Sequence, residues 1–122
     1  MKYMLLIYAE EQAWSKLSEA DRNAMYAEYG TFTQDIIASG HFVAGSELKP
    51  TSAATSVRVR DGKRMLTDGP FAETREHLGG YYLVTAKDLY EAIGIAARIP
   101  SVRLGTIEIR PVVEMSAPTT AS

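Results

Sequence analysis

The stretch Met4-Leu5-Leu6-Ile7 is apolar at every position and not only at alternate ones. Successive side chains of a strand point to opposite faces of a sheet, so a strand of this kind must be buried on both faces. The stretch Tyr81-Tyr82-Leu83-Val84 has the same character. Because of these two stretches, we expect two central strands, residues 3–9 and 81–86, in a sheet that is covered on both sides.

The other elements are predicted from helix caps, apolar spacing and turn residues. Ser18 and Asp88 are each placed to cap a helix, and Gly40 and Pro100 mark the two helix ends. Asp61-Gly62 is a favoured pair for a two-residue hairpin turn. In chain order, the elements expected are a strand at 3–9, a helix from 18, a strand at 41–48, a hairpin of 56–60 and 63–67, a strand at 81–86, a helix from 88 and a strand at 106–112.

This order of elements predicts an α+β fold, the ferredoxin-like βαββαβ arrangement with an inserted β-hairpin. Two helices can cover only one face of such a sheet, and no further element remains for the other face. A second copy of the chain is the economical cover, and it would give a homodimer with two sheets face to face, a dimeric α+β barrel. A monomer whose tail or hairpin folds over the open face is the alternative.

The length of 122 residues is that of one domain, which we place at residues 1–113. Residues 114–122 are mostly small and polar, with little to bury. We expect them to form a disordered C-terminal tail.

Composition restricts the classes of partner and of chemistry. The formal net charge is −2 and the basic residues form no run, which argues against a nucleic-acid partner. The absence of cysteine excludes disulfides, thiolate metal sites and a cysteine nucleophile. The first apolar segment is too short to cross a bilayer and lacks the features of a signal peptide, so we expect a cytoplasmic protein without a membrane partner.

The segment 67–76, TDGPFAETRE, combines a well-specified backbone with ionisable side chains. Gly69 can adopt a positive φ and Pro70 fixes its own φ, so we expect a rigid loop, and such loops often carry sites. Asp68 is expected to cap this turn while facing a cleft, where it could act with Glu73 as general acid and base. The alternative is that Asp68 only pins a turn between two strands.

Glu76 and His77 would share a face with Glu73 if residues 72–77 formed a helical turn, but we favour a solvated turn as their interpretation. No His-x-x-x-His or His-Glu-x-x-His spacing occurs. Gly79-Gly80 lacks the pattern of a phosphate loop and precedes a strand, so a bend or a close backbone approach explains it better. We therefore predict neither a metal nor a cofactor.

Three further residues are candidates for binding a substrate. Arg110, on the polar side of the last strand, could clamp a carboxylate bidentately, or it could simply pair with a neighbouring glutamate. Phe71 and Tyr82 could line a cleft, although core packing is the commoner role of aromatic residues in strands.

The chain resembles the YCII-related family, and specifically its DGPF branch. The resemblance is carried by residues 67–76, by 78–82 (LGGYY) and by 107–111 (IEIRP), and it extends over residues 1–113. It implies a dimeric α+β barrel with a cleft between the sheets and the helices or the partner subunit.

The resemblance also bears on the site, because Asp68 and Glu73 match the family motif. Members of the wider family that look like enzymes use a histidine and aspartate pair, with the histidine in the first helix before the glycine that matches Gly40. Here that helix holds no histidine, and Tyr29 stands at about the matching place. The resemblance therefore does not extend to this pair.

Two hypotheses of function follow. The first is a small-molecule-binding protein and cofactor-independent enzyme of isomerase or lyase type, with Asp68 and Glu73 catalytic and Phe71, Tyr82 and Arg110 binding the substrate. The second is a non-catalytic regulatory or interaction module, because DGPF members are often encoded beside extracytoplasmic-function sigma factors. A concave, partly apolar cleft with a desolvated carboxylate would favour the enzyme, and a closed core with a conspicuous outer patch would favour the module.

Overall fold

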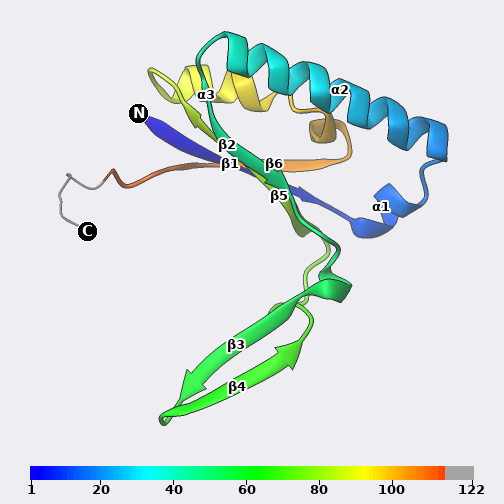
Figure 1. Cartoon of the computed structure of the whole chain (residues 1–122), viewed down its shortest axis with the longest axis vertical. Helices are drawn as coiled ribbons and strands as arrows, with labels where there is room; N and C mark the ends of the chain where they lie inside the picture. Colours follow the sequence, from blue (N-terminus) through cyan, green and yellow to red (C-terminus); the bar gives the residue numbers. More distant parts are fainter. Residues whose placement is uncertain (115–122) are drawn as a thin grey trace.

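A computed structural model describes residues 1–114 of the chain (Figure 1). Four strands form one antiparallel sheet in the order β2-β5-β1-β6. Their bounds are Lys2–Ala9 for β1, Phe42–Glu47 for β2, His77–Thr85 for β5 and Gly105–Pro111 for β6. The predicted α+β ferredoxin-like arrangement is confirmed, with β1 and β5 at the centre. The predicted tail lies outside the described residues, except for Glu114.

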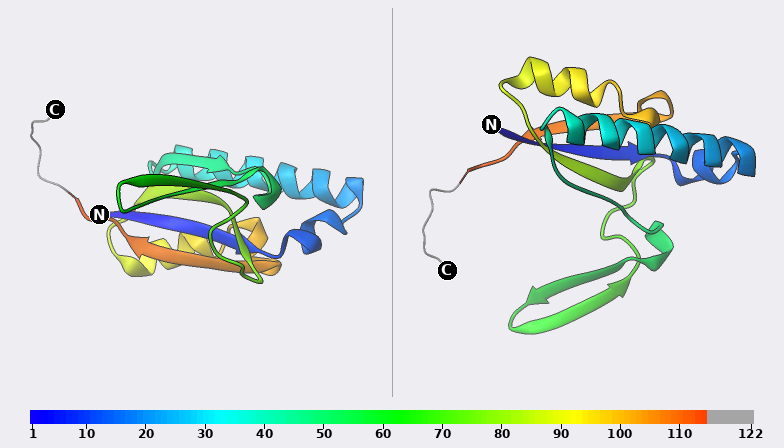
Figure 2. Two further views of the ribbon diagram at one scale, coloured as in Figure 1. Left: turned by 90° about the horizontal axis from the view of Figure 1, so that it is seen from below. Right: turned by 45° about the horizontal axis from the view of Figure 1, so that its top comes forward.

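The helices α2 (Glu19–Ala38) and α3 (Leu89–Ala96) lie together on one face of the sheet (Figures 1 and 2). Both begin at the caps that the sequence predicts: the Ser18 side chain accepts a hydrogen bond from Asp21 N at 3.1 Å, and Asp88 accepts one from Glu91 N at 2.9 Å. A short helix α1 (Glu11–Ser15) and two 3₁₀ turns, η1 (Thr51–Ala53) and η2 (Pro100–Arg103), were not predicted. Segments of three to five residues are too short to show an apolar period.

The core lies between the sheet and these helices. Its fully buried side chains are Leu5 of β1, Ile36 of α2, Val84 of β5 and Ile99 beyond α3. Along β1 the residues that face the helices are buried, and the alternate residues are only half-buried. One face of the sheet is therefore the core of the subunit, and the other, the open face, carries Met4, Leu6 and Leu83.

The start of β5 differs from the prediction. The strand begins at His77 and not near residue 81, and residues 72–76 form bends instead of a helical turn. The register with β1 shifts at Gly79: Ile7 pairs with Gly80, but Tyr8 pairs with Leu78. This one-residue β-bulge confirms the irregular backbone expected at Gly79-Gly80, and it reverses the faces of the residues before it.

The inserted hairpin forms a separate two-stranded sheet, here named the arm (residues 55–68). It consists of β3 (Thr55–Arg60) and β4 (Lys63–Asp68), joined by the predicted turn, in which Asp61 and Gly62 have φ of 52° and 74°. The arm projects from the end of the sheet on the side away from α2 and α3 (Figures 1 and 2). Among the described residues it pairs with none of the other four strands.

Two glycines give a matched test of this packing. A Cβ added at Gly45 in β2 would lie 2.8 Å from the Tyr82 ring, whereas a Cβ added at Gly30 in α2 would meet nothing within 4 Å. We expect Gly45→Ala to lower the free energy of unfolding by about 1–3 kcal/mol, because the ring must move. Gly30→Ala should raise it by about 0.5–1 kcal/mol through helix propensity. Urea denaturation measures both, and equal stability of Gly45→Ala and the parent would contradict the packing of Tyr82.

Candidate functional site

A cavity of about 850 Å³ lies on the helix side of the sheet, between α1, α2, the edge strand β2 and its neighbour β5. Aromatic side chains make up much of its wall: Trp14, Tyr26, Tyr29, Phe42 and Tyr82. This volume and composition are those of a small-molecule site.

Packing between the rings fixes this wall. Trp14 meets Tyr26 edge to face at a centroid distance of 5.3 Å, and Tyr29 lies nearly parallel to Tyr82 at 6.5 Å. Phe42 approaches Tyr82 edge to face at 6.4 Å. The rings of the wall therefore form two packed groups: Trp14 with Tyr26, and Tyr82 with both Tyr29 and Phe42.

Two tyrosine hydroxyls of the wall are paired. The Tyr29 hydroxyl donates to Ser101 Oγ at 2.5 Å, and the Tyr82 hydroxyl lies 2.7 Å from Thr33 Oγ1. Burial raises the pKa of Tyr29 and of Tyr82 above the ordinary value of 10.0, although these hydrogen bonds act in the opposite direction. Both side chains are protonated at neutral pH, so they offer hydroxyl groups and not phenolate bases.

The carboxylates at the cavity also have partners. Glu11 accepts hydrogen bonds from the Thr51 backbone N–H and hydroxyl, each at 2.7 Å, and these bonds lower the pKa of Glu11 below its ordinary value of 4.5. Glu47 accepts a hydrogen bond from the Tyr26 hydroxyl at 3.0 Å. Glu11 is thus held in its charged form, and it is not the desolvated carboxylate that would favour the enzyme hypothesis.

His77 also lines the cavity, and it differs from these tyrosines and carboxylates. Its Nδ1 atom is buried and has no hydrogen-bond partner within residues 1–114. Because of the bulge at Gly79, His77 pairs with Ala9. Ala9 lies on the same face of β1 as Ile7, so His77 is on the face of β5 that is turned toward the helices. Without the extra residue, the strand would turn this histidine to the open face.

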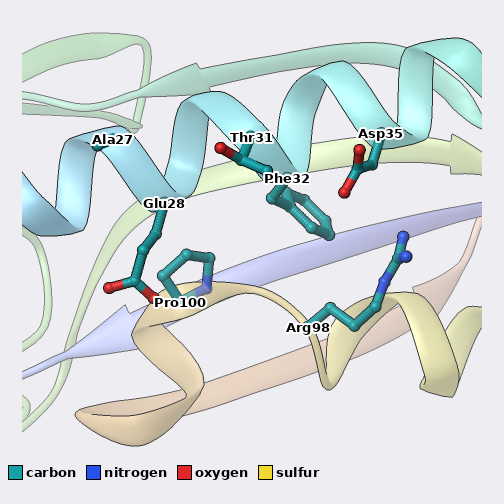
Figure 3. Close-up of a pocket in the computed structure, with 7 residues that line it drawn as sticks. All are labelled: Ala27, Glu28, Thr31, Phe32, Asp35, Arg98 and Pro100. Carbon is teal, nitrogen blue, oxygen red and sulfur yellow. The ribbon is translucent and has the colours of Figure 1, made fainter.

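A second, smaller hollow of about 400 Å³ lies on another side of α2 (Figure 3). Arg98 extends across it toward Asp35, with its guanidinium carbon 5.6 Å from the centre of the Phe32 ring. Glu28 at its rim is already paired with Arg103 at 2.8 Å. Its charged side chains are exposed to water, so we regard it as a surface groove.

Comparison with known proteins identifies the family of the chain. The YCII-related domain matches residues 1–116 of the chain. The chain belongs to the YCII-related family. A protein of Rhizobium meliloti (strain 1021), described as uncharacterised, is 31% identical over 113 residues, which cover 91% of each chain. The DGPF branch within this family remains a resemblance.

In this YCII-related chain, the residues predicted for the site lie apart. Tyr82 lines the large cavity. Asp68 is the last residue of β4 and Glu73 lies in the following loop, both exposed, while Phe71 is 78% exposed. Arg110 lies beside Met4 on the open face, where its Nε donates to Glu108 at 3.0 Å. One subunit does not bring these four residues together with Tyr82, and their roles remain predictions.

The structure locates the residues at two positions of the family pattern. Tyr29, which stands at about the place of the family's histidine, lines the cavity from α2. The loop of the DGPF motif reaches the cavity rim through an ion pair between Arg75 and Glu10. Within residues 1–114, no three or more metal-binding side chains cluster, and no helix is long and apolar enough to cross a membrane.

Sequence reasoning missed His77, because the strand was expected to begin four residues later and the histidine was assigned to a solvated turn. Gly79-Gly80 was the available signal, since glycine within a strand often marks a bulge. The contribution of Trp14 had no comparable signal, because its short helix was not predictable.

The charge of Glu11 gives a pH-dependent prediction. Because its pKa is lower in the folded state, Glu11 stabilises the fold fully above its unfolded pKa, and this contribution is lost as the pH falls through the folded pKa. Glu11→Gln should therefore be less stable than the parent at pH 7, and the difference should shrink toward pH 3. Urea denaturation at both pH values tests this, with Glu73→Gln, at an exposed position, as the control. A difference between Glu11→Gln and the parent that is independent of pH would contradict it.

Proposed function

We propose that this protein binds a small organic molecule in the 850 Å³ cavity. The observation that carries the proposal is a cavity of this size whose wall consists largely of packed aromatic rings. Binding pockets are commonly apolar surfaces with a few placed polar groups. Such a wall suits a flat or aromatic ligand with a hydrogen-bonding group.

The charges around the cavity restrict the ligand further. Three carboxylates line it, from Glu10, Glu11 and Glu47, against a single lysine, Lys49. An excess of negative charge disfavours an anionic ligand by direct repulsion. The ligand that fits best is therefore neutral or cationic.

A second copy of the chain is our proposal for the partner. Val57, Val59 and Leu66 share one face of the arm and are 59%, 59% and 63% exposed. A hairpin of two strands is only marginally stable without a surface to pack against. The arm also holds four basic and two acidic residues, whereas the rest of the chain holds nine basic and 13 acidic ones. A positive arm is complementary to the negative body of another copy.

This arrangement bears on the predicted acid and base. Asp68 ends the arm and Arg110 lies on the open face, so both belong to the side of the molecule where we place the second copy. An acid-base role for Asp68 and Glu73 would thus require a site completed between subunits. The rival function, a regulatory module linked to a sigma-factor system, draws its support from the same exposed arm.

Ligand binding can be followed through Trp14, the single tryptophan of the chain, which lines the cavity. We expect neutral aromatic fragments to change its fluorescence and to saturate at one site per subunit. Thr33→Phe, which places a ring in the cavity, should weaken binding at least tenfold. Thr31→Phe makes the same change on the same helix beside the smaller hollow and should leave binding unchanged. Equal binding by both variants and the parent would contradict the proposed site.

The dimer has its own test by light scattering. At micromolar concentration we expect about twice the chain mass of 13.4 kDa. Leu83→Glu places a charge on the open face and should give monomers, whereas Leu89→Glu on α3 should remain dimeric. A parent species that stays at 13.4 kDa would contradict the dimer and would leave the arm for a different protein, as the interaction-module hypothesis expects.

A further inference from the structure

One corner of the cavity combines two aromatic rings with a carboxylate. Trp14 and Tyr26 both line the cavity, and their ring planes meet at 83°, so the two rings form adjoining walls. The Tyr26 hydroxyl donates a hydrogen bond to Glu47 Oε2 at 3.0 Å, which brings this carboxylate to the same corner. Tyr26 is 49% exposed and Glu47 is also exposed, so a ligand can reach the corner from water.

The pairing of β2 with β5 turns Glu47 toward the cavity. Glu47 lies two residues after Gly45, whose Cα faces the Tyr82 ring, so both positions share the face of β2 that is turned to the helices. The cross-strand neighbour of Glu47 is Gly80, which has no side chain. Because both Glu47 and Gly80 line the cavity, the space beside this carboxylate is left to a ligand.

Of the three carboxylates that line the cavity, Glu47 is the one that remains for a cation. Glu10 already forms an ion pair with Arg75, and Glu11 already accepts two hydrogen bonds from Thr51. Within residues 1–114, Glu47 forms no ion pair, and its bond to Tyr26 comes from a neutral hydroxyl. A positively charged ligand group would therefore not have to displace a side chain from this carboxylate.

The charge of Glu47 also acts on the tyrosines of the cavity. Burial raises the pKa of Tyr26 above its ordinary value of 10.0, and the hydrogen bond to Glu47 and its charge act in the same direction. After burial, the charge of Glu47 also contributes to the raised pKa of Tyr29, so its field extends beyond the corner. Two basic residues are near, Lys49 in the cavity wall and Arg22 beside Tyr26, but among the described residues neither forms an ion pair with Glu47.

We propose that this corner binds the substituted ammonium group of an organic cation whose flat, apolar body fills the rest of the cavity. This inference rests on the proposed binding function. Ammonium groups are attracted to the faces of tryptophan and tyrosine rings, and a nearby carboxylate adds direct attraction. The apolar body then packs against Tyr29, Phe42 and Tyr82. A metal ion fits less well, since within residues 1–114 no three or more metal-binding side chains cluster.

Two probes of the same shape isolate the effect of charge: trimethyl(4-hydroxyphenyl)ammonium and 4-tert-butylphenol, in which carbon replaces the nitrogen. By calorimetry at pH 6, we expect the parent to bind both, and the cation at least tenfold more tightly. Glu47→Gln keeps an acceptor for the Tyr26 hydroxyl but removes the charge. It should weaken binding of the cation at least fivefold and that of the neutral probe less than twofold. Glu28→Gln, the same change beside the smaller hollow, is the matched control and should bind both probes like the parent.

A second measurement uses the unaltered chain and so does not depend on the folding of a variant. In the parent, nuclear Overhauser effects should connect the N-methyl protons of the bound cation to ring protons of Trp14 and Tyr26.

The outcomes separate this inference from the proposed function. Equal dissociation constants of the two probes in the parent would overturn the preference for a cation. Absence of the Overhauser effects, or the same affinity for the cation in Glu47→Gln and Glu28→Gln, would overturn the placement of the ammonium group. Binding of other aromatic fragments, but of neither probe, would overturn the ligand class. Each of these results leaves the binding function intact, whereas no binding of any aromatic fragment would overturn the proposed function itself.

Discussion

The pairing of β1 with β5 is the constraint on which the rest of this structure depends. Both strands are apolar on both faces, so both faces of the sheet must be removed from water. The one pair of helices, α2 and α3, can cover only one of these faces. The helix side forms the core around Leu5 and Val84. On the open face, Met4, Leu6 and Leu83 are only half-buried, and this is the reason for our proposal that a second copy covers them.

The same strand pair also creates the candidate site, at the point where its regular register stops. Up to Ile7 and Gly80 the alternation of β1 and β5 supplies the core. Beyond the bulge the alternation is reversed, and a position that would have faced outward faces the cavity instead. His77 lies at this position because the register has changed and because β5 begins beside the cavity.

Much of the fold could be predicted from local signals. The caps Ser18 and Asp88 and the turn Asp61-Gly62 are chemical requirements of a few adjacent residues, and all three occur where the sequence places them. The cavity depends on how α1, α2 and β2 approach one another, which no local pattern encodes. The site predictions for Asp68 and Glu73 came from a motif whose glycine and proline determine the local backbone conformation. Such a motif determines the shape of the loop, but not which surface of the molecule the loop will lie beside.

The two surfaces are separate: one side of the sheet is proposed for assembly, and the other for ligand binding. In the proposed dimer, the open face and the arm would contact another chain through apolar residues and opposite charges. The helix side holds a cavity in which the carboxylates and the hydroxyls of Tyr26, Tyr29 and Tyr82 are already bonded, which holds these three rings in place before a ligand binds. Preorganisation of this kind lowers the entropy cost of binding.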